Sequence, residues 1–558
     1  MKNDPIELEL FRHLLASIAE EMGAVLRKTA FSANIKERRD YSCAVYDSGG
    51  NTVAMGDHMP VHLGAMPLSV EHVRKAFELQ PGDVAILNDP FQGGTHLPDI
   101  TAVSAVFLAG KRKPAFFLAN RAHHADVGGM SPGSMPMARE IYQEGLRIPP
   151  ILLVRRGRTD RSLLRLILAN VRTPEEREGD LLAQLMAIHR GEVRLREMVD
   201  RYGLTVVGRN MSRLQQYSER MMRAAIRKLP DGEYRFEDFL DGDGISAEPV
   251  RIAVAVTIEG DSATVDFTGS AAQVSGPLNA NYAIAIAATT YAFRCLIREE
   301  VPFTAGLMRP VTVIAPAGTV VNALPPAAMA AGNVETSQRI TDVLLGALSR
   351  AAPDRIPAAS SGTMNNLTFG GWDSRRGRAF AYYETIAGGM GAGPINAGES
   401  AVHTHMTNSW NTPVEALEHQ YPVRIRKYGI RSGSGGAGEH AGGDGIIRSF
   451  EFLTAAEVTI LPSRRANGPY GLGGGMPGKP GRNTLIRNGR KIAVAAMAQL
   501  TVESGDVLEI ESPGGGGFGG PGGVRDCLAP LPLLLPLLLP APGLPSSTPT
   551  DSDENGAN

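Results

Sequence analysis

Two short, glycine-rich segments in the first quarter of the chain gather side chains that bind metals or move protons. They are NDPFQGGTHLPDI (residues 88–100) and ANRAHHADVGG (residues 119–129). Together they hold three of the twelve histidines and three aspartates, namely Asp89, His96, Asp99, His123, His124 and Asp126. Imidazole and carboxylate groups in this combination suit a divalent transition metal such as zinc, manganese or iron.

The residues between the two segments predict a β-hairpin that would bring them together. Residues 101–108 and 114–119 are rich in β-branched and aromatic side chains, with a short polar turn between them. If the strands pair antiparallel about that turn, Asp99 lies opposite His123, and His96 can curl back toward the same point. Two imidazoles, one carboxylate and a free position form the ligand set of an open, catalytic metal site. The alternative is a cluster of polar loop residues that only satisfies the backbone of the turns.

Length and composition limit the class of protein. With 558 residues, the chain is long enough for several hydrophobic cores. Its 56 basic and 58 acidic residues nearly balance, which argues against electrostatic binding of nucleic acid. The three cysteines form no CxxC pair, and the acidic, helix-forming N-terminus is unlike a signal peptide. We therefore expect a protein of the reducing cytoplasm.

The spacing of apolar residues predicts an α+β protein with several lobes and a β- and glycine-rich C-terminal lobe. The expected helices cover residues 5–29, 67–79, 174–201, 209–228, 283–298 and 336–350. The expected strands include residues 41–47, 52–55, 84–87, 250–258 and 262–267. We expect residues 1–524 to form one family domain, with a metal-binding lobe over about 1–230, a middle lobe over about 231–415 and a β-rich lobe over about 416–524.

The last part of the chain, residues 525–558, differs in composition from the rest. Residues 528–545 (LAPLPLLLPLLLPAPGLP) are almost entirely leucine and proline. A membrane helix needs about 20 apolar residues without repeated helix breakers, and prolines recur here every few positions. We expect a disordered tail and no membrane association.

Three further histidines are weaker candidates. His58 and His62 have HxxxH spacing, but Pro60 argues against the helix that would align them. They can still line the same cavity as the metal, although a purely structural role is favoured. His189 falls on the apolar side of an expected helix, which indicates a core histidine rather than a ligand.

Other polar segments have structural interpretations that compete with function. Asn333 can cap the helix that follows, with Glu335 in its first turn. Arg38 and Arg39 can bind an anionic substrate group, but pairing at the surface is favoured. Residues 433–438 match GxGxxG without a strand before or a helix after, so we expect a glycine-rich turn. No GxxxxGK[ST] phosphate loop occurs in the sequence.

Several long motifs resemble the hydantoinase B/oxoprolinase family. Besides the two glycine-rich segments, they are EIYQEGLRIPP (140–150), VDFTGSAAQVSGPLNAN (265–281), AGNVETSQRITD (331–342) and SPGGGGFG (512–519). The family includes the B subunits of ATP-dependent N-methylhydantoinases, the C-terminal half of 5-oxoprolinase and the α-type subunits of acetone and acetophenone carboxylases. The resemblance implies that His96, Asp99 and His123 hold a divalent metal (Mn, Zn or Fe). It also implies that His124 or Asp126 orients a ligand or moves a proton.

For mechanism, the resemblance implies a division of labour within a hetero-oligomer. A hydantoinase A-type partner would use ATP to phosphorylate the carbonyl oxygen of a cyclic amide, and this chain would complete the hydrolysis with metal-activated water. The expected activity is therefore that of the hydrolytic subunit of a 5-oxoprolinase or N-methylhydantoinase. Two alternatives stay open, a subunit of an ATP-dependent ketone carboxylase and a non-catalytic scaffold for the A-type partner.

Overall fold

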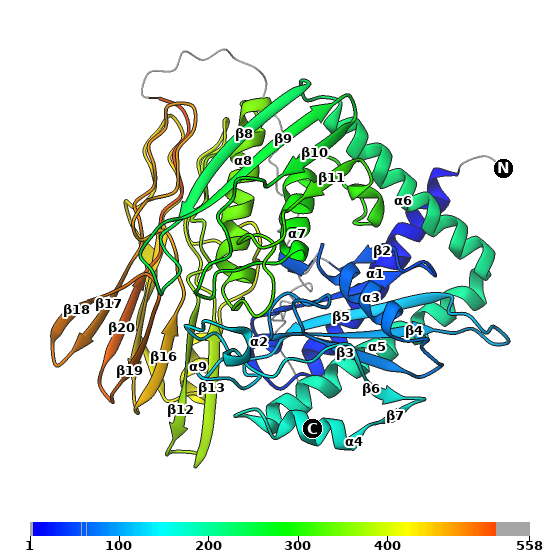
Figure 1. Ribbon diagram of the computed structural model, residues 1–558, viewed down its shortest axis with the longest axis horizontal. Helices are drawn as coiled ribbons and strands as arrows, with labels where there is room; N and C mark the ends of the chain where they lie inside the picture. Colours follow the sequence, from blue (N-terminus) through cyan, green and yellow to red (C-terminus); the bar gives the residue numbers. More distant parts are fainter. Residues whose placement is uncertain (1–3, 57–58, 63, 521–558) are drawn as a thin grey trace, which may run out of the picture.

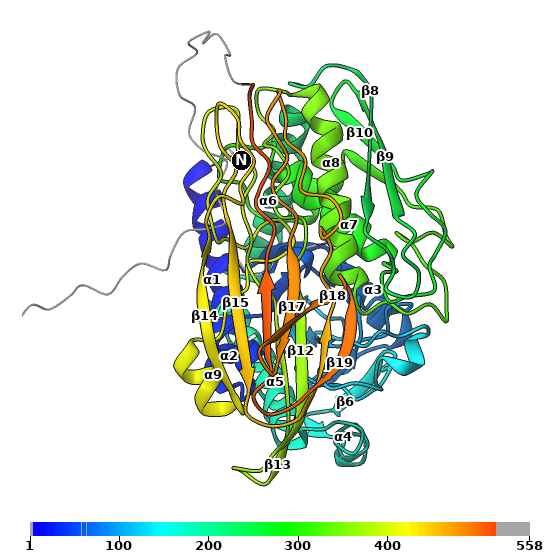
Figure 2. The ribbon, with the colours of Figure 1, turned by 90° about the vertical axis from the view of Figure 1, so that its left-hand side faces the viewer.

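The computed structural model describes residues 4–56, 59–62 and 64–520, which form four β-sheets flanked by helices (Figure 1). The mixed α+β architecture predicted from the sequence is confirmed. The first sheet has seven strands, and the other three have four, four and five. In two perpendicular views, the strands of the last two sheets form one side of the molecule (Figures 1 and 2). The expected tail, residues 525–558, lies outside the described residues.

Three long helices cover one face of the first sheet. Helix α1 (Pro5–Thr29) begins where the Asp4 carboxylate accepts a hydrogen bond from the Ile6 amide. Its apolar face packs against α5 (Pro174–Tyr202) and against the sheet. Helix α6 (Leu204–Ile226) follows directly, because Gly203 has a φ of 79° that lets the chain turn between the two helices.

The seven-stranded sheet carries both motif segments. Its order is β2-β1-β5-β4-β3-β6-β7. The strands are β1 (Tyr41–Tyr46), β2 (Thr52–Met55), β3 (Val84–Leu87), β4 (Asp99–Val106), β5 (Phe116–His123), β6 (Ile151–Arg155) and β7 (Arg158–Thr159). The short helices beside it are α2 (Ala33–Lys36), α3 (Met66–Ala76) and α4 (Arg161–Leu168). Strands β4 and β5 are central and buried along their whole length, so polar side chains on them need partners inside the protein.

The middle of the chain forms a four-stranded sheet and two buried helices. The sheet order is β11-β10-β9-β8, with β8 (Gly232–Leu240), β9 (Val250–Glu259), β10 (Ser262–Asp266) and β11 (Val311–Ile314). The helices are α7 (Tyr282–Arg294) and α8 (Ser337–Ala351). A π-helical turn, Gly332–Thr336, leads directly into α8. A side chain at Gly332 would collide with the backbone of Asn279, so glycine is needed where these segments cross.

The C-terminal part contains two antiparallel sheets and α9 (Val414–Gln420). One has the order β13-β12-β16-β19, with β12 (Leu367–Asp373), β13 (Arg378–Glu384), β16 (Ala456–Ile460) and β19 (Ala498–Val502). The other has the order β14-β15-β20-β17-β18, with β14 (Val423–Arg431), β15 (Gly445–Phe452), β17 (Arg482–Arg487), β18 (Arg490–Val494) and β20 (Val507–Glu511). Because β12 and β13 share a sheet with strands from beyond residue 416, the expected lobe boundary there falls within one sheet.

Close packing of backbone explains the glycine-rich C-terminal motif. Gly515 N donates to Gly443 O and Gly516 N donates to Ala359 O, each at 2.8 Å. A Cβ atom at Gly516 would collide with the carbonyl group of Tyr470. Residues 433–438, which match GxGxxG, pack alongside, with Gly436 N donating to Gly515 O (2.8 Å). Glycine is required in this layer because neighbouring chain segments approach too closely for side chains.

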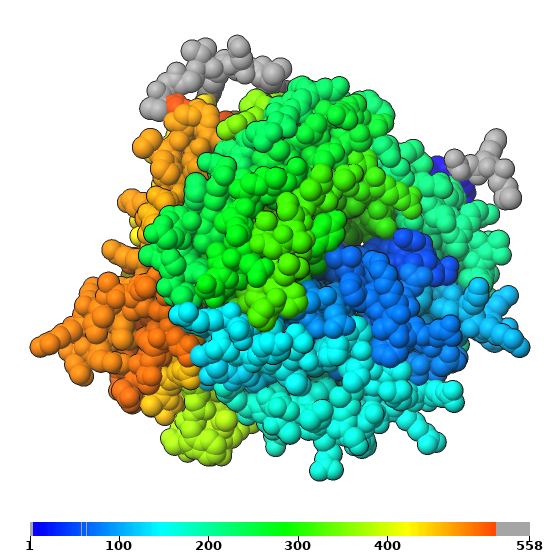
Figure 3. Space-filling model, viewed as in Figure 1, coloured from blue at the N-terminus to red at the C-terminus, as the bar shows by residue number. Residues whose placement is uncertain are grey.

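The part of the chain that forms the seven-stranded sheet and the middle part of the chain are packed directly against each other. Figure 3 shows the middle of the chain, in green, lying on the cyan segment of the first sheet. The two motif segments meet in the interior between these parts. Among the described residues, no helix is both long enough and apolar enough to cross a membrane.

Candidate metal centre

The hairpin brings the two motif segments together at one end of the sheet. Strands β4 and β5 pair antiparallel, and Asp99 lies opposite His123. Asp99 N donates to His96 O (3.1 Å), so the preceding loop folds back toward the strand. The pairing predicted from the position of the turn is confirmed.

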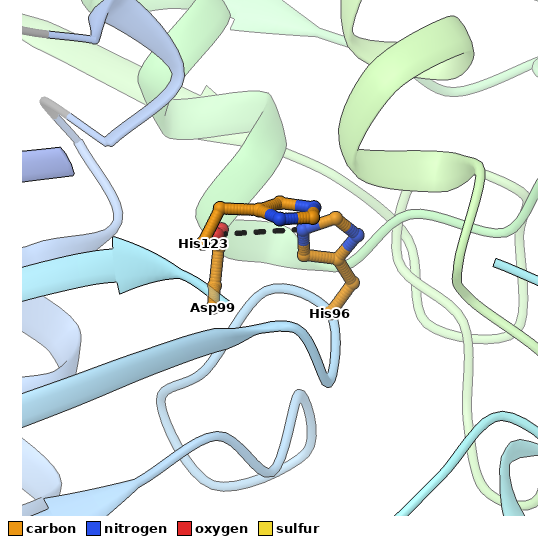
Figure 4. A group of neighbouring side chains, drawn as sticks. All are labelled: His96, Asp99 and His123. Carbon is orange, nitrogen blue, oxygen red and sulfur yellow. Dashed lines mark ion pairs between the residues drawn. The ribbon is translucent and has the colours of Figure 1, made fainter. Parts of the chain in front are cut away.

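The side chains of His96, Asp99 and His123 converge in a closed interior site (Figure 4). One ligand atom from each lies within 4.8 Å of the other two, and His96 Nε2 is 3.5 Å from Asp99 Oδ1. All three residues are at most 2% exposed. Within the described part of the chain, Asp99 Oδ1 and His123 Nε2 have no hydrogen-bond partner. Buried polar atoms without partners are rare, and two in one cluster indicate a place for a ligand.

A third imidazole forms one wall of this cluster. His62 Nε2 lies 3.4 Å from Asp99 Oδ2, and its Nδ1 lies 2.9 Å from Ser42 Oγ. His62 comes from a short 3-10 turn, Pro60–His62. The other member of the HxxxH pair, His58, lies outside the described residues.

His96 is held by the segment that leads into α8. Its Nδ1 donates to Ala330 O (3.0 Å), so Nε2 carries the lone pair. Asn333 Nδ2 donates to His96 Nε2 (3.0 Å) and lies 3.4 Å from Asp99 Oδ2. The predicted capping role of Asn333 is wrong, because the residue lies inside the π-helical turn and its amide reaches the cluster. Such turns are frequent at functional sites.

His123 is held from another direction by α2. Asn34 Nδ2 lies 2.8 Å from His123 Nδ1 and donates to the His123 carbonyl oxygen (2.7 Å). Arg38 donates to Asn34 Oδ1 and also to the hydroxyl groups of Thr385 and Ser409. The expected surface pairing of Arg38 is wrong, since its side chain is fully buried and its hydrogen bonds go to uncharged acceptors. It supports the ring of His123 through Asn34.

Arg39 has a different environment from its neighbour. Its guanidinium carbon lies 3.5 Å from the centre of the exposed Trp410 ring. Arg39 also adopts a positive φ of 58°. A cation–π contact at the surface therefore replaces the expected ion pair.

The charge states in the cluster suit a cation. Burial alone would raise the pKa of Asp99, but the His96 and His62 rings hold it well below its ordinary value. Burial lowers the pKa of His123 well below the ordinary range, so its ring is neutral. Thr95 Oγ1 donates to Asp99 Oδ2 (2.8 Å) and fixes the carboxylate. Metal ligands must be deprotonated carboxylates and neutral imidazoles, and the directions of the Asp99 and His123 pKa shifts agree with this requirement.

The other two predicted site residues, His124 and Asp126, are not brought into the cluster. His124 Nε2 lies 3.0 Å from Gln184 Oε1 of α5. The Asp126 carboxylate accepts hydrogen bonds from two amides of its own loop and pairs with Arg172 at 3.1 Å. These contacts favour structural roles over the orienting or proton-transfer roles expected. Asp89 likewise bonds within its own loop, to the Phe91 amide.

His189 was predicted to lie in the core, and this is wrong. It is exposed on α5, whereas the preceding residue, Ile188, is buried. Successive residues of a helix differ by about 100° in direction, so an apolar neighbour does not place a residue on the same face.

Several residues of the site give no signal in the sequence. Tyr383 of β13 stacks on the His123 ring, with centroids 4.2 Å apart and planes 13° apart. Asn34 is a single polar residue without a motif spacing that relates it to the histidines. Tertiary structure alone brings Tyr383 here, from about 260 residues further along the chain.

Comparison with known proteins gives relatives of two lengths. The chain is 39% identical to 5-oxoprolinase 1 of Arabidopsis thaliana over 92% of its own length, but it spans only 42% of that protein. It is also 31% identical to a protein of Pseudomonas sp. (strain NS671) named as the B-type subunit of a D-/L-hydantoinase. That match covers 93% of this chain and 90% of the relative.

Two solved structures share the fold. An ATP-dependent caprolactamase from Pseudomonas jessenii matches with a TM-score of 0.86 and 30% identity, covering 93% of this chain and 92% of the other. An acetone carboxylase matches with a TM-score of 0.84, covering 93% of this chain and 76% of the other, but at 18% identity it shows the fold alone. The profile of Hydantoinase B/oxoprolinase matches residues 4–521. The chain therefore belongs to the hydantoinase B/oxoprolinase family.

Proposed function

We propose that this chain is the hydrolytic subunit of an ATP-dependent cyclic amidohydrolase and that His96, Asp99 and His123 hold its divalent metal. The observation that carries the proposal is the closed cluster of three donors, two of them with a buried atom that no described residue satisfies. Zinc bonds to imidazole and carboxylate are about 2.0–2.2 Å long, so donors on one ion lie up to about 4.4 Å apart. A cluster within 4.8 Å needs only small movements to reach that spacing.

The residues present fit a hydrolytic role. A bound divalent metal supplies Lewis-acid chemistry, which lowers the pKa of water and polarises an oxygen atom. His96, Asp99 and His123 would hold the ion as three protein ligands, and a catalytic site of this kind keeps a further position for water or substrate. His62 lies close enough to Asp99 to hold or pass a proton at its Nε2, with Ser42 fixing the ring. His124 and Asp126 would then support the loop that carries His123.

We further propose that ATP is used by a separate A-type partner. An amide carbonyl is a poor electrophile, and phosphorylation of its oxygen creates a leaving group that lowers the barrier. The lengths of the relatives support a partner, because the same segment fills 90% of a hydantoinase subunit and only 42% of a 5-oxoprolinase. The sequence of this chain contains no phosphate loop.

Metal analysis of the purified chain tests the site. We expect about one divalent transition metal per chain and its loss in His96→Ala, Asp99→Asn and His123→Ala, because each removes one of three ligands. His189→Ala is the matched control, since this histidine is exposed and far from any cluster role. Full metal content in all three ligand variants would refute the assignment.

Turnover measurements test the reaction class. The chain should be inactive alone and should support substrate-dependent ATP hydrolysis once an A-type partner is added. Parallel assays with 5-oxoproline, hydantoins and a larger lactam such as caprolactam would identify the ring. A further assay with a ketone and bicarbonate tests for carboxylase activity. Turnover in that assay alone would overturn the hydrolase proposal. Turnover that persists in His96→Ala would favour a scaffold role.

A further inference from the structure

One face of the His123 ring is covered by a tyrosine whose hydroxyl group begins a series of buried hydrogen bonds. The Tyr383 ring lies nearly parallel to the imidazole, 4.2 Å away. Its hydroxyl donates to Asn366 Oδ1 (2.9 Å), and Asn366 Nδ2 donates to Glu335 Oε1 (3.0 Å). All three residues are at most 2% exposed. The hydrogen bonds therefore run from the ring that stacks on His123 to a buried carboxyl group, without contact with solvent.

Glu335 anchors the far end of this chain. Its Oε1 also accepts a hydrogen bond from the Met364 amide (2.9 Å), and within the described residues its Oε2 has no partner. The acceptor at Oε1 fixes the orientation of the Asn366 amide, which must then present its oxygen to Tyr383. Glu335 thus decides which hydrogen bond the tyrosine hydroxyl makes.

The same π-helical turn braces both imidazoles. Asn333 reaches His96 from this turn, and Glu335, two residues later, reaches Asn366. Residues two apart in a helical turn point in very different directions. This buried turn thereby contacts His96 directly and is linked to His123 through Asn366 and Tyr383.

The surroundings favour a neutral carboxylic acid at Glu335 over part of the physiological pH range. Burial raises the pKa of Glu335 to about 7. The charged groups facing it are Arg339 from α8 and Arg465 from the loop after β16, and both favour the ionised form. Neither forms an ion pair with Glu335 among the contacts of the described residues. Both protonation states can accept the two N–H hydrogen bonds.

We propose that Glu335, Asn366 and Tyr383 are positioning residues of the metal centre, which fix the plane of the His123 ring and thereby its affinity for the metal. The inference rests on the proposed metal site and deepens it. Supporting residues of this kind commonly change metal affinity by 10–100-fold when replaced, because the ligand ring loses its preferred orientation. No contact with substrate is assigned to any of the three.

The strand that carries Tyr383 also offers a matched control for the key substitution. Tyr382 is adjacent in β13 and fully buried, and its hydroxyl donates to Glu384 (2.6 Å) and also contacts Thr412 (2.9 Å). Its ring packs among aromatic residues of the C-terminal sheets rather than on His123. Tyr383→Phe and Tyr382→Phe therefore each remove a buried hydroxyl group from the same strand, but only one touches the metal centre.

The experiment measures Co²⁺ and Mn²⁺ dissociation constants of the full-length chain, with no partner or substrate. Tyr383→Leu should weaken binding about tenfold, and Tyr383→Phe and Glu335→Ala about threefold each. Glu335→Gln should stay near wild type, because its amide oxygen accepts the same two hydrogen bonds. The double variant Tyr383→Phe/Glu335→Ala should be no weaker than the worse single variant, since both act through one route.

Distinct outcomes separate this inference from the proposed function. Wild-type affinity in Tyr383→Leu and Glu335→Ala would overturn the positioning chain while leaving the metal site intact. An equal loss in Tyr382→Phe would also overturn it, because the effect would then be general destabilisation. If the wild type binds no metal, the proposed metal site is refuted. The positioning role of Tyr383 is then tested by the ¹⁵N chemical shifts of the His123 ring in histidine-labelled protein. Tyr383→Phe should move those shifts and Tyr382→Phe should not.

Discussion

Glu144 is a buried carboxyl group whose ionisation should make the stability of this protein depend on pH. Its carboxyl Oε1 accepts hydrogen bonds from Met329 N (2.6 Å) and Ala330 N (2.8 Å), and Oε2 has no partner among the described residues. The carbonyl of Ala330 in turn accepts from His96 Nδ1. Burial raises the pKa of Glu144 to about 8, even though the two N–H groups act against it. We predict that Glu144→Gln makes the protein more stable at alkaline pH.

The sign and size follow from proton linkage. Between its ordinary pKa of 4.5 and about 8, the folded protein holds a proton that the unfolded chain has lost. The stability that Glu144 contributes as an acid is complete below pH 4.5 and is lost as the pH rises through 8. At about 1.36 kcal/mol per pH unit, the loss approaches about 5 kcal/mol, an upper limit that any entry of water reduces. Glutamine keeps the two acceptor contacts and does not titrate.

Thermal unfolding from pH 5 to pH 9 measures this effect. Unfolding entropy is about 2.1 cal/mol/K per residue, so for the roughly 510 described residues the Tm shifts by about 1 °C per kcal/mol. The Tm of wild type and Glu144→Gln should agree near pH 5 and differ by up to about 5 °C near pH 9, with the variant higher. Glu248→Gln, in an exposed loop, is the control. Parallel pH profiles for wild type and Glu144→Gln would refute the reasoning.

Four further outcomes are expected. Asn34→Asp should tighten metal binding, because a carboxylate accepts a hydrogen bond from His123 Nδ1–H and so leaves the Nε2 lone pair free for the metal. Weaker binding in a metal titration would show that the Asn34 amide donates to His123 Nδ1 when the metal is bound. His189→Ala should change Tm by less than about 0.5 °C, as measured by calorimetry, because the residue is exposed. Gly516→Ala should sharply reduce soluble yield and Tm, since a methyl group has no room beside Tyr470. Truncation after about residue 524 should leave folding and metal content unchanged, and early melting of the truncated chain would contradict a disordered tail.

The part of the site that could be predicted from the sequence is the part set by local periodicity. Side chains along a strand alternate between the two faces of the sheet, and the residue numbers of antiparallel partners have a constant sum. The position of one turn is therefore enough to place Asp99 opposite His123. Helix α1 was equally accessible, because Asp4 and Pro5 mark its start and apolar residues recur at helical spacing.

The rest of the site depends on tertiary packing that no local pattern encodes. Asn333 satisfies the sequence rules for a helix cap, yet a π-helical turn begins one residue earlier and redirects its side chain to His96. Arg38 is a charged residue of a type usually found at the surface, but one neutral acceptor four residues away and three from distant segments make its burial possible. For His189 the prediction was wrong in the opposite direction, since a residue predicted to be buried is exposed. Apolar neighbours in the sequence do not determine which face of a long helix a residue lies on.

The cluster of His96, Asp99 and His123 is supported by residues that are distant in the sequence. Its donors come from one hairpin, but the groups that orient them come from α2, from the turn before α8 and from β13, which are far apart in the chain. The hairpin alone could present the two histidines and the aspartate without fixing their rings. The packing of the middle and C-terminal parts on the first sheet therefore does more than bury apolar surface. It also brings the groups that orient His96 and His123 to the hairpin.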